Sequence, residues 1–239
     1  MEEKNTDQDY LECEKFWIFL MMICVGGFLG AYTFVLKGGV FCNAQTANFV
    51  LLALHLGQGH WAKAGYFLIP ISAYLAGAIL SEFLPKRINR WEILRWDTFF
   101  VGFEMICFLL IGLVPDDAPP QFCQIFVNFV ASMQYNTFRQ ATGVSLATTF
   151  CTNHLRQVGI HTVKWFRKKN PAALVRLKMH GWMLGAFVAG GIASAFLCGW
   201  FQGKTIWWAE LLLLIVFLDL LRADLSYEKD RIHQVPHGH

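Results

Sequence analysis

Charged side chains are scarce along this sequence. Only 15% of its 239 residues are charged, while 55% are hydrophobic and the mean hydropathy is +0.40. A soluble domain carries about 25% charged residues. Long apolar runs with few charges recur from one end of the chain to the other, which excludes an ordinary soluble domain and predicts a polytopic membrane protein.

Three other signals are missing. The first 15 residues contain six acids and two lysines, so the basic start of a cleaved signal peptide is absent and the first apolar run is expected to be an uncleaved span. The seven cysteines include no CxxC pair and lie mostly in apolar runs, which predicts small buried side chains and not a disulfide framework. No HExxH or cofactor motif occurs, so we expect neither an enzyme nor a cofactor or metal site.

Six apolar stretches are long enough to cross about 30 Å of hydrocarbon as helices. They cover Phe16–Leu36, Trp61–Leu84, Asp97–Val114, Gln121–Phe138, Ala173–Trp200 and Ile206–Leu221. Two segments between them, residues 37–60 and 139–168, contain polar clusters, "FCNAQTANFV" and "TTFCTNHLRQVG". Polar residues between apolar runs need a reason, because backbone that is not helical is tolerated at membrane depth only inside protein or beside water.

The charges of the loops favour one arrangement of these two polar segments. Lys and Arg in short loops mark the cytoplasmic side. The loops at 85–96 and 167–178 are both basic, whereas "PDDAPP" between them contains no base. Eight full crossings would place the two basic loops on opposite faces. Two re-entrant segments and six crossings place both basic loops and both termini in the cytoplasm, and we predict this arrangement over the alternative of full crossing.

An internal repeat supports the same plan. A shift of 106 residues places Thr46 on Thr152, Asn48 on His154 and Glu104 on Glu210. With three crossings per unit, the two units must have opposite orientations, as in many transporters and channels. We therefore predict an all-α integral membrane protein with six transmembrane helices plus two broken or re-entrant helices in an inverted internal repeat. The expected parts are a cytoplasmic N-terminal tail (1–15), a first repeat (16–114), a second repeat (121–223) and a cytoplasmic C-terminal tail (224–239).

The polar clusters are the candidate site. Lys37, Gly38 and Gly39 are expected to break the first helix, and the polar residues that follow can cap a short helix at its N-terminus. Two such N-termini, entering from opposite faces, would present free N–H donors to an anion or a hydrogen-bond acceptor. The candidate solute-binding residues are Asn43, Gln45, Thr46, Asn48, Asn136, Arg139, Thr152, Asn153 and His154. The alternative is that Thr46, Asn48, Thr152 and His154 only cap and pack helix ends.

Two carboxylates, Glu104 and Glu210, lie in apolar surroundings and are candidates for proton coupling, because an ionisable group inside a membrane is costly. The alternative is that each is neutral or hydrogen-bonded to a neighbouring helix. Arg139 and Arg156 flank the second cluster, where they either attract an anion or extend to the cytoplasmic interface. His154 and His161 share one helical face, but a metal site needs more ligands.

The stretches "GGFLGAYTFVLKGGVFCNAQTANFV" and "SMQYNTFRQATGVSLATTFCTNHL" resemble the two signatures of the YoaK-like bacterial membrane proteins, a domain of unknown function. The resemblance covers nearly the whole chain and implies the bacterial plasma (inner) membrane. This chain departs from the family's pattern at three places. Gly30 replaces a usual acid, Thr46-Ala47-Asn48 replaces Thr-Gly-Asn, and Thr152-Asn153 replaces Thr-Gly. A proton-carrying role of that acid in relatives is therefore not expected at Gly30.

These features predict a multi-pass transporter or channel for a small polar or anionic solute. The alternative is a non-transporting membrane partner protein or an intramembrane enzyme. A partner protein would not need paired polar breaks at the middle of the bilayer, and an enzyme should show a catalytic or cofactor motif, of which none is visible. The expected partners are the lipid bilayer and the solute, and not nucleic acid. A homo-oligomer, the identity of the solute and the choice between channel and secondary transporter stay open.

Overall fold

The computed structural model describes residues 10–238. In this part of the chain the fold is all-α apart from one hairpin of two-residue strands, β1 (Gln140–Ala141) and β2 (Val144–Ser145). The helices are α1 (Phe16–Leu36), α2 (Gln45–Gly57), α3 (Trp61–Phe83), α4 (Pro85–Ile88), α5 (Trp96–Gly112), α6 (Pro120–Thr137), α7 (Thr152–Lys168), α8 (Pro171–Phe201) and α9 (Ala209–Leu225). Short 3-10 turns are η2 (Glu12–Glu14), η3 (Asn89–Trp91), η4 (Gln202–Trp208) and η5 (Lys229–Arg231).

Helix α1 has the bounds that the apolar pattern predicts, and α3, α5, α6 and α8 begin and end within two residues of their predicted bounds. The last helix differs. It was expected over Ile206–Leu221, but α9 starts at Ala209 because the chain first makes the 3-10 turn η4. Gln202 has a φ of 50°, which ends α8 and starts this turn. The hairpin after α6 was not expected; its turn has Thr142 and Gly143 at positive φ.

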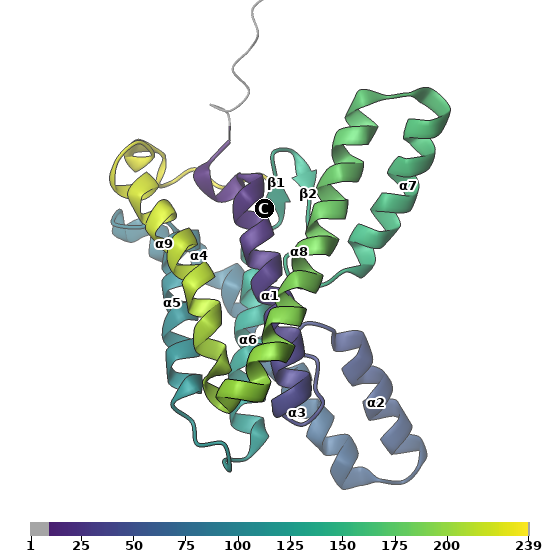
Figure 1. Cartoon of the computed structure of the whole chain (residues 1–239). Coiled ribbons are helices and arrows are strands. Elements are labelled where there is room, and N and C mark those ends of the chain that lie inside the picture. The colour runs from purple at the N-terminus through teal and green to yellow at the C-terminus, as the bar shows by residue number, and fades with distance from the viewer. Residues whose placement is uncertain (1–9, 239) are drawn as a thin grey trace, which may run out of the picture.

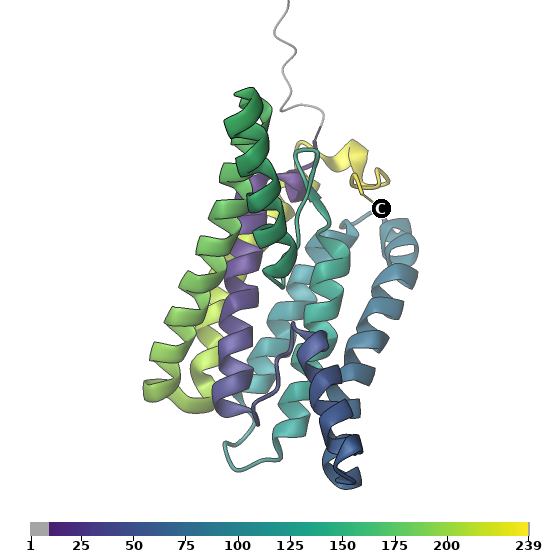
Figure 2. The ribbon, with the colours of Figure 1, turned by 90° about the vertical axis from the view of Figure 1, so that its right-hand side faces the viewer.

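The long helices run side by side, and the chain turns at two ends of the bundle (Figure 1). The described ends of the chain, α4 and the α7–α8 turn lie at one end, and the α2–α3, α5–α6 and α8–α9 connections lie at the other. Helices α2 and α7 differ from the rest. Each starts near the middle of the bundle, and they run to opposite ends (Figure 2). We call residues 37–44, before α2, the first break and residues 138–151, before α7, the second break.

Glycines allow the two most extensive helix contacts, α1 against α8 and α3 against α6. A Cβ on Gly27 of α1 would collide with the carbonyl of Phe187 on α8, and a Cβ on Gly190 of α8 would collide with that of Cys24. These glycines therefore allow close packing of the two helices. Gly181 and Gly185 of α8 face open space in the described part of the chain and have no such role.

Two helices among residues 10–238 are long and apolar enough to cross a membrane, Phe16–Leu36 and Trp61–Trp91. Large apolar side chains are also exposed on the outer faces of other helices, for example Ile106, Ile192 and Leu218. These observations support the prediction of a membrane protein at the coarse level. Six crossings, the inverted repeat and the orientation of the termini stay predictions.

A buried network ties both ends of the chain to the bundle. Arg95 is 1% exposed; its guanidinium contacts Asp97 at 3.1 Å and Glu228 at 3.4 Å, and its backbone N–H donates to Asp224. Burial opposes the charge of Arg95, but Asp97, Cys13 and Glu228 together outweigh it and raise the pKa of the guanidinium. The backbone N–H of Glu12 donates to Glu228 at 2.8 Å. Most of the predicted N-terminal tail, residues 1–9, lies outside the described residues.

Candidate functional site

The first break is made by two glycines. Gly38 and Gly39 have φ values of 77° and 69°, a region that L side chains rarely adopt, and they reverse the chain after α1 as predicted. A Cβ on Gly38 would also collide with the hydroxyl of Tyr66. The chain then returns towards the middle of the bundle, where α2 begins at Gln45.

Side-chain amides hold the first break in place. Asn48 Nδ2 donates to the carbonyl of Phe41 at 3.0 Å and to Gln45 Oε1 at 3.1 Å. Gln45 Nε2 donates to Asn128 Oδ1 at 2.9 Å, which links α2 to α6. One helical turn away, Gln124 Nε2 donates to the carbonyl of Lys37 at 2.7 Å. Side chains thus satisfy the backbone carbonyls of Lys37 and Phe41, as non-helical backbone at membrane depth requires, while Oδ1 of Asn48 and Oε1 of Gln124 are buried without a partner among the described residues.

In the second break, His154 and Gln134 make the hydrogen bonds to backbone carbonyls. His154 Nε2 lies 2.8 Å from the carbonyl of Ala147, and its Nδ1 lies 2.9 Å from Nδ1 of His180 on α8. Since the carbonyl can only accept, neutral His154 carries its proton on Nε2, and His180 donates from Nδ1. Gln134 Nε2 donates to the carbonyl of Met22 at 3.0 Å and reaches that of Thr148 at 3.4 Å. Gln134 therefore connects α6, α1 and the second break.

Equivalent hydrogen bonds stabilise the two breaks. Asn48 bonds the carbonyl of Phe41, and His154 bonds the carbonyl of Ala147. In each case the side chain reaches back seven residues, and both members of the second pair follow those of the first by 106 residues. This is the shift at which the sequence places Asn48 on His154.

The two breaks meet at one cavity of about 490 Å³. Asn43 and Ala44 line it from the first break, and Thr149–Thr152 line it from the second. Phe41 also lines it from the first break, and the remaining walls come from α1 and α8 and are mainly apolar: Gly27, Gly30, Ala31, Phe34, Val35, Phe187 and Gly191. We call this the central cavity. Its walls are less polar than the two polar clusters predicted. The side chains of Gln45, Asn48 and His154 do not line the cavity and instead hydrogen-bond to α6 or to the backbone of the breaks.

Both helices that start at the cavity lack a side-chain cap. The N-cap residues are Ala44 for α2 and Cys151 for α7, and both line the cavity. The prediction that polar side chains cap these helices is therefore wrong. Without a cap, the first-turn N–H groups have no side-chain acceptor, and the positive end of each helix dipole faces the cavity. The hydroxyl of Thr149, also in the cavity wall, is buried and lies near the hydroxyl of Tyr74 on α3 without a hydrogen bond of normal geometry.

The predicted site residues separate into three groups. Asn43 and Thr152 line the central cavity. Gln45, Asn48 and His154 lie outside the cavity wall and stabilise the breaks by hydrogen bonds. Thr46 is exposed and does not line the cavity.

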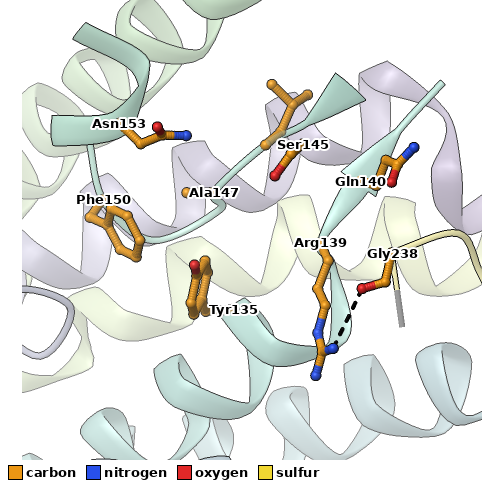
Figure 3. A pocket seen from close by; sticks show the side chains of 9 residues that line it. Tyr135, Arg139, Gln140, Ser145, Ala147, Phe150, Asn153 and Gly238 are labelled. Atoms are coloured by element: carbon orange, nitrogen blue, oxygen red, sulfur yellow. Dashed lines mark hydrogen bonds between the residues drawn. The ribbon is translucent and has the colours of Figure 1, made fainter. Parts of the chain in front are cut away.

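The third group lies nearer the end of the bundle that carries the described chain ends. There a smaller cavity of about 220 Å³ is lined by Arg139, Asn153, Tyr135, Phe150 and Gly238, among others (Figure 3). Asn136 bonds Ser81 at 2.9 Å, and Arg139 bonds Glu82 at 2.8 Å, so both attach α6 to α3. Phe150 lines both this cavity and the central one, and its ring lies 4.8 Å from that of Tyr135. An aromatic pair therefore stands between the two cavities.

Sequence reasoning missed the polar stripe of α6. Gln124, Asn128 and Ser132 are buried and follow one another at four-residue spacing, and Gln134 is buried beside them. Polar residues at this spacing inside a predicted span occupy one helix face. That periodicity would have identified α6 as the helix that supports both breaks.

Glu104 and Glu210 lie apart from the central cavity, on α5 and α9, which pack against each other. Glu104 is 0% exposed, and none of the four carboxylate oxygens has a hydrogen-bond partner in the described part of the chain. The two groups are close enough to interact electrostatically. Two such carboxylates cannot both be ionised there without a large cost, since nothing compensates their charge.

No three His, Cys, Asp or Glu side chains among residues 10–238 are placed to hold a metal ion. His161 and His180 stack at 6.0 Å, and His180 bonds His154, but the three rings do not surround a common point. All seven cysteines are free.

Comparison with known proteins gives a family without a function. No curated protein and no solved structure matches the chain. The model of one family, "Protein of unknown function (DUF1275)", matches residues 18–218, which include both breaks and both helices that start from them. A match over this much of the chain agrees with the resemblance of the two motifs, and the chain belongs to the DUF1275 family of proteins of unknown function.

Proposed function

We propose that this protein is a multi-pass membrane transporter or channel for a small polar or anionic solute, and that the solute binds in the central cavity. The observation that carries the proposal is the meeting of two oppositely directed, uncapped helix N-termini at one cavity. Discontinuous helices whose N-termini face an anionic group are the binding sites of many transporters.

The proposal includes six crossings by α1, α3, α5, α6, α8 and α9, arranged as an inverted repeat in which α2 and α7 are re-entrant. Three observations support it. The basic loops and the described chain ends share one end of the bundle. The proposed repeat relates α1 to α6, α2 to α7 and α3 to α8. It therefore relates the α1–α8 contact to the α6–α3 contact, and the α2–α3 contact to the α7–α8 contact. The two breaks are also closed by side chains that reach back the same distance. The end with the basic loops would then be cytoplasmic, in a bacterial plasma membrane.

The walls of the cavity define the solute further. Backbone N–H groups and the hydroxyl of Thr149 supply hydrogen-bond donors, whereas Phe34, Phe41 and Phe187 supply apolar walls. Among residues 10–238, no carboxylate or cationic side chain lines the cavity. A small anion with an apolar body, such as a short monocarboxylate, fits both kinds of surface, and a metal cation fits neither.

The test is uptake by proteoliposomes that contain the full chain, with a panel of short carboxylates, inorganic anions and neutral polar solutes. Thr149→Val removes a hydroxyl from the cavity at constant shape and should reduce uptake by roughly two- to tenfold, the effect of one hydrogen bond. Thr148→Val is the matched control. Its hydroxyl is also buried without a hydrogen bond of normal geometry but does not line the cavity.

A second variant tests the charge of the solute. Asn43→Asp places a carboxylate in the cavity wall at nearly constant volume and should abolish uptake of anions more strongly than uptake of neutral solutes. If no solute of the panel enters liposomes faster than in protein-free controls, or if Thr148→Val and Thr149→Val behave alike, the central cavity is not the solute site.

A further inference from the structure

A third and larger cavity lies at the end of the bundle that carries the basic loops. Its volume is about 590 Å³, and it lies between the ends of α3 and α6, the α4–η3 segment, the start of α5 and the C-terminal segment. The polar residues that matter in its wall are Lys86, Asn89, Arg90, Arg95, Asp97 and His233. It shares no residue with the central cavity.

Two cations in the wall of this cavity differ from the third in their ion pairing. Arg95 contacts two carboxylates, Asp97 and Glu228, so its positive charge is more than compensated. Lys86 and Arg90 are exposed, and no ion pair is found for either within residues 10–238. Glu82, the other acid in the wall, pairs with Arg139 at 2.8 Å. The cavity therefore presents two cations without an acidic partner.

A neutral donor stands between these cations. Asn89 Oδ1 accepts the backbone N–H of Trp96 at 2.8 Å, which fixes the amide in the cavity wall, and its Nδ2 group can donate to another acceptor. Two cations and an amide donor form a set suited to the oxygens of a phosphate group.

The segment that carries these groups also exposes large apolar side chains. Phe83 is 56% exposed, Trp91 is 61% exposed and Ile93 is 64% exposed. The guanidinium of Arg87 lies 4.4 Å from the centroid of the Phe83 ring. Aromatic side chains with neighbouring cations are typical of the region between lipid headgroups and acyl chains.

We propose that this cavity binds the phosphate of an anionic phospholipid of the cytoplasmic leaflet, with Lys86, Arg90 and Asn89 on the phosphate and Phe83, Trp91 and Ile93 beside the acyl chains. The inference rests on the membrane embedding and orientation of the proposed function, but not on the solute. Free phosphate shares the chemistry of the headgroup. It would use the cations but has no use for the apolar side chains beside them, and the lipid is therefore the ligand that accounts for both.

The experiment measures phospholipid bound to the full-length protein by native mass spectrometry, and the shift of its thermal unfolding midpoint, in neutral detergent. The probes are phosphatidylglycerol, phosphatidylcholine and inorganic phosphate. Phosphatidylglycerol should bind and raise the midpoint, whereas phosphatidylcholine and inorganic phosphate at the same concentration should not. The double variant Lys86→Gln/Arg90→Gln should weaken phosphatidylglycerol binding by about tenfold or more, since each cation near a membrane surface contributes on the order of fivefold.

The matched control is Arg167→Gln/Lys168→Gln. It removes the same charge at the same end of the bundle, at the end of α7, where neither residue lines this cavity. Equal weakening in the control pair would overturn the proposal in favour of non-specific surface attraction. An equal midpoint shift with inorganic phosphate would overturn the lipid as the ligand. Trp91→Ala should weaken phosphatidylglycerol binding, because it removes an apolar side chain beside the acyl chains. Solute uptake by the Lys86/Arg90 variant is measured in parallel, and a loss of lipid binding with normal uptake separates this site from the central cavity.

Discussion

At the scale of single residues, each break depends on one side chain that reaches back to a carbonyl. Asn48 does this with a flexible amide, and His154 does it with a ring that also bonds His180. Both side chains are 0% exposed, so water cannot replace them. A buried carbonyl that loses its donor costs about 1–3 kcal/mol.

His154→Ala is therefore expected to lower the free energy of unfolding by about 1–3 kcal/mol, because it leaves the carbonyl of Ala147 and Nδ1 of His180 without a partner. Denaturant-induced unfolding of the detergent-solubilised protein measures the loss. His161→Ala is the control on the same helix face, since Nδ1 of His161 has no partner to lose. A larger loss in the control would contradict the role of His154 in holding the second break.

A pH effect is expected at the N-terminal end of α1. Burial opposes ionisation of Glu12, but hydrogen bonds with Lys15, Tyr227 and Asp219 and the charge of Lys15 together outweigh it and lower the pKa of the carboxyl from its usual 4.5. A carboxyl with a lowered folded-state pKa stabilises the fold above its unfolded value, and this stabilisation is lost as the pH falls through the folded value. Tyr227→Phe removes one of these bonds and brings the folded-state pKa closer to the unfolded value, so the variant should be less stable at neutral pH and should lose less stability on acidification, with the loss complete at a higher pH, in thermal unfolding scans between about pH 3 and pH 6. Identical acid limbs for both proteins would contradict this assignment.

At the scale of elements, the positions of the helices could largely be predicted from the sequence, but the turns and hydrogen bonds that connect them could not. Apolar runs located α1 and α3 almost to the residue because a long hydrophobic helix is a local property of the sequence. The hairpin after α6 and the 3-10 turn before α9 depend on positive φ at Thr142 and Gln202, which non-glycine residues adopt only in a suitable tertiary setting. The partners of Asn48 and His154 are equally non-local, since they belong to loops that the rest of the bundle positions.

The elements at the end with the basic loops are joined by Arg95, which precedes α5 and bonds the segment after α9. Arg95→Gln leaves Asp97 and Glu228 buried without a cation and should cost about 3–5 kcal/mol of unfolding free energy. Burial already raises the pKa of Glu228, and without Arg95 it should rise further, so the variant should recover part of its stability at acidic pH. Unfolding titrations at two pH values measure both effects. Arg222→Gln, on α9 but outside this network, should cost much less.

At the scale of the whole molecule, the loop charges and the break geometry favour the same topology. Both basic loops and the described chain ends lie at one end of the bundle, and the acidic α5–α6 loop lies at the other. This arrangement results from the opposite directions of α2 and α7, and the sequence of a single helix does not determine it. The charges of the loops could therefore predict it, whereas the shape and the apolar walls of the central cavity required the structure.

Labelling with a membrane-impermeant maleimide checks the topology. Cysteine at Arg90 or Lys169 should react only after the cells are opened, and cysteine at Asp117 should react in intact cells. The seven native cysteines contribute little background because five are buried and two are half-buried. Reaction of the Lys169 position in intact cells would exclude re-entrant α7 and require a full crossing.

In both breaks a side chain hydrogen-bonds to the carbonyl seven residues before it, and this shared spacing bears on the origin of the chain. If the two halves descend from one duplicated gene, the ancestral polypeptide had one break and three crossings, and two copies inserted in opposite directions to build one cavity. Such an ancestor needed loops with nearly balanced charge, and the present asymmetry of Lys and Arg would have arisen only after fusion fixed each half in one direction. The amide at Asn48 and the imidazole at His154 would then be two later solutions to one inherited contact.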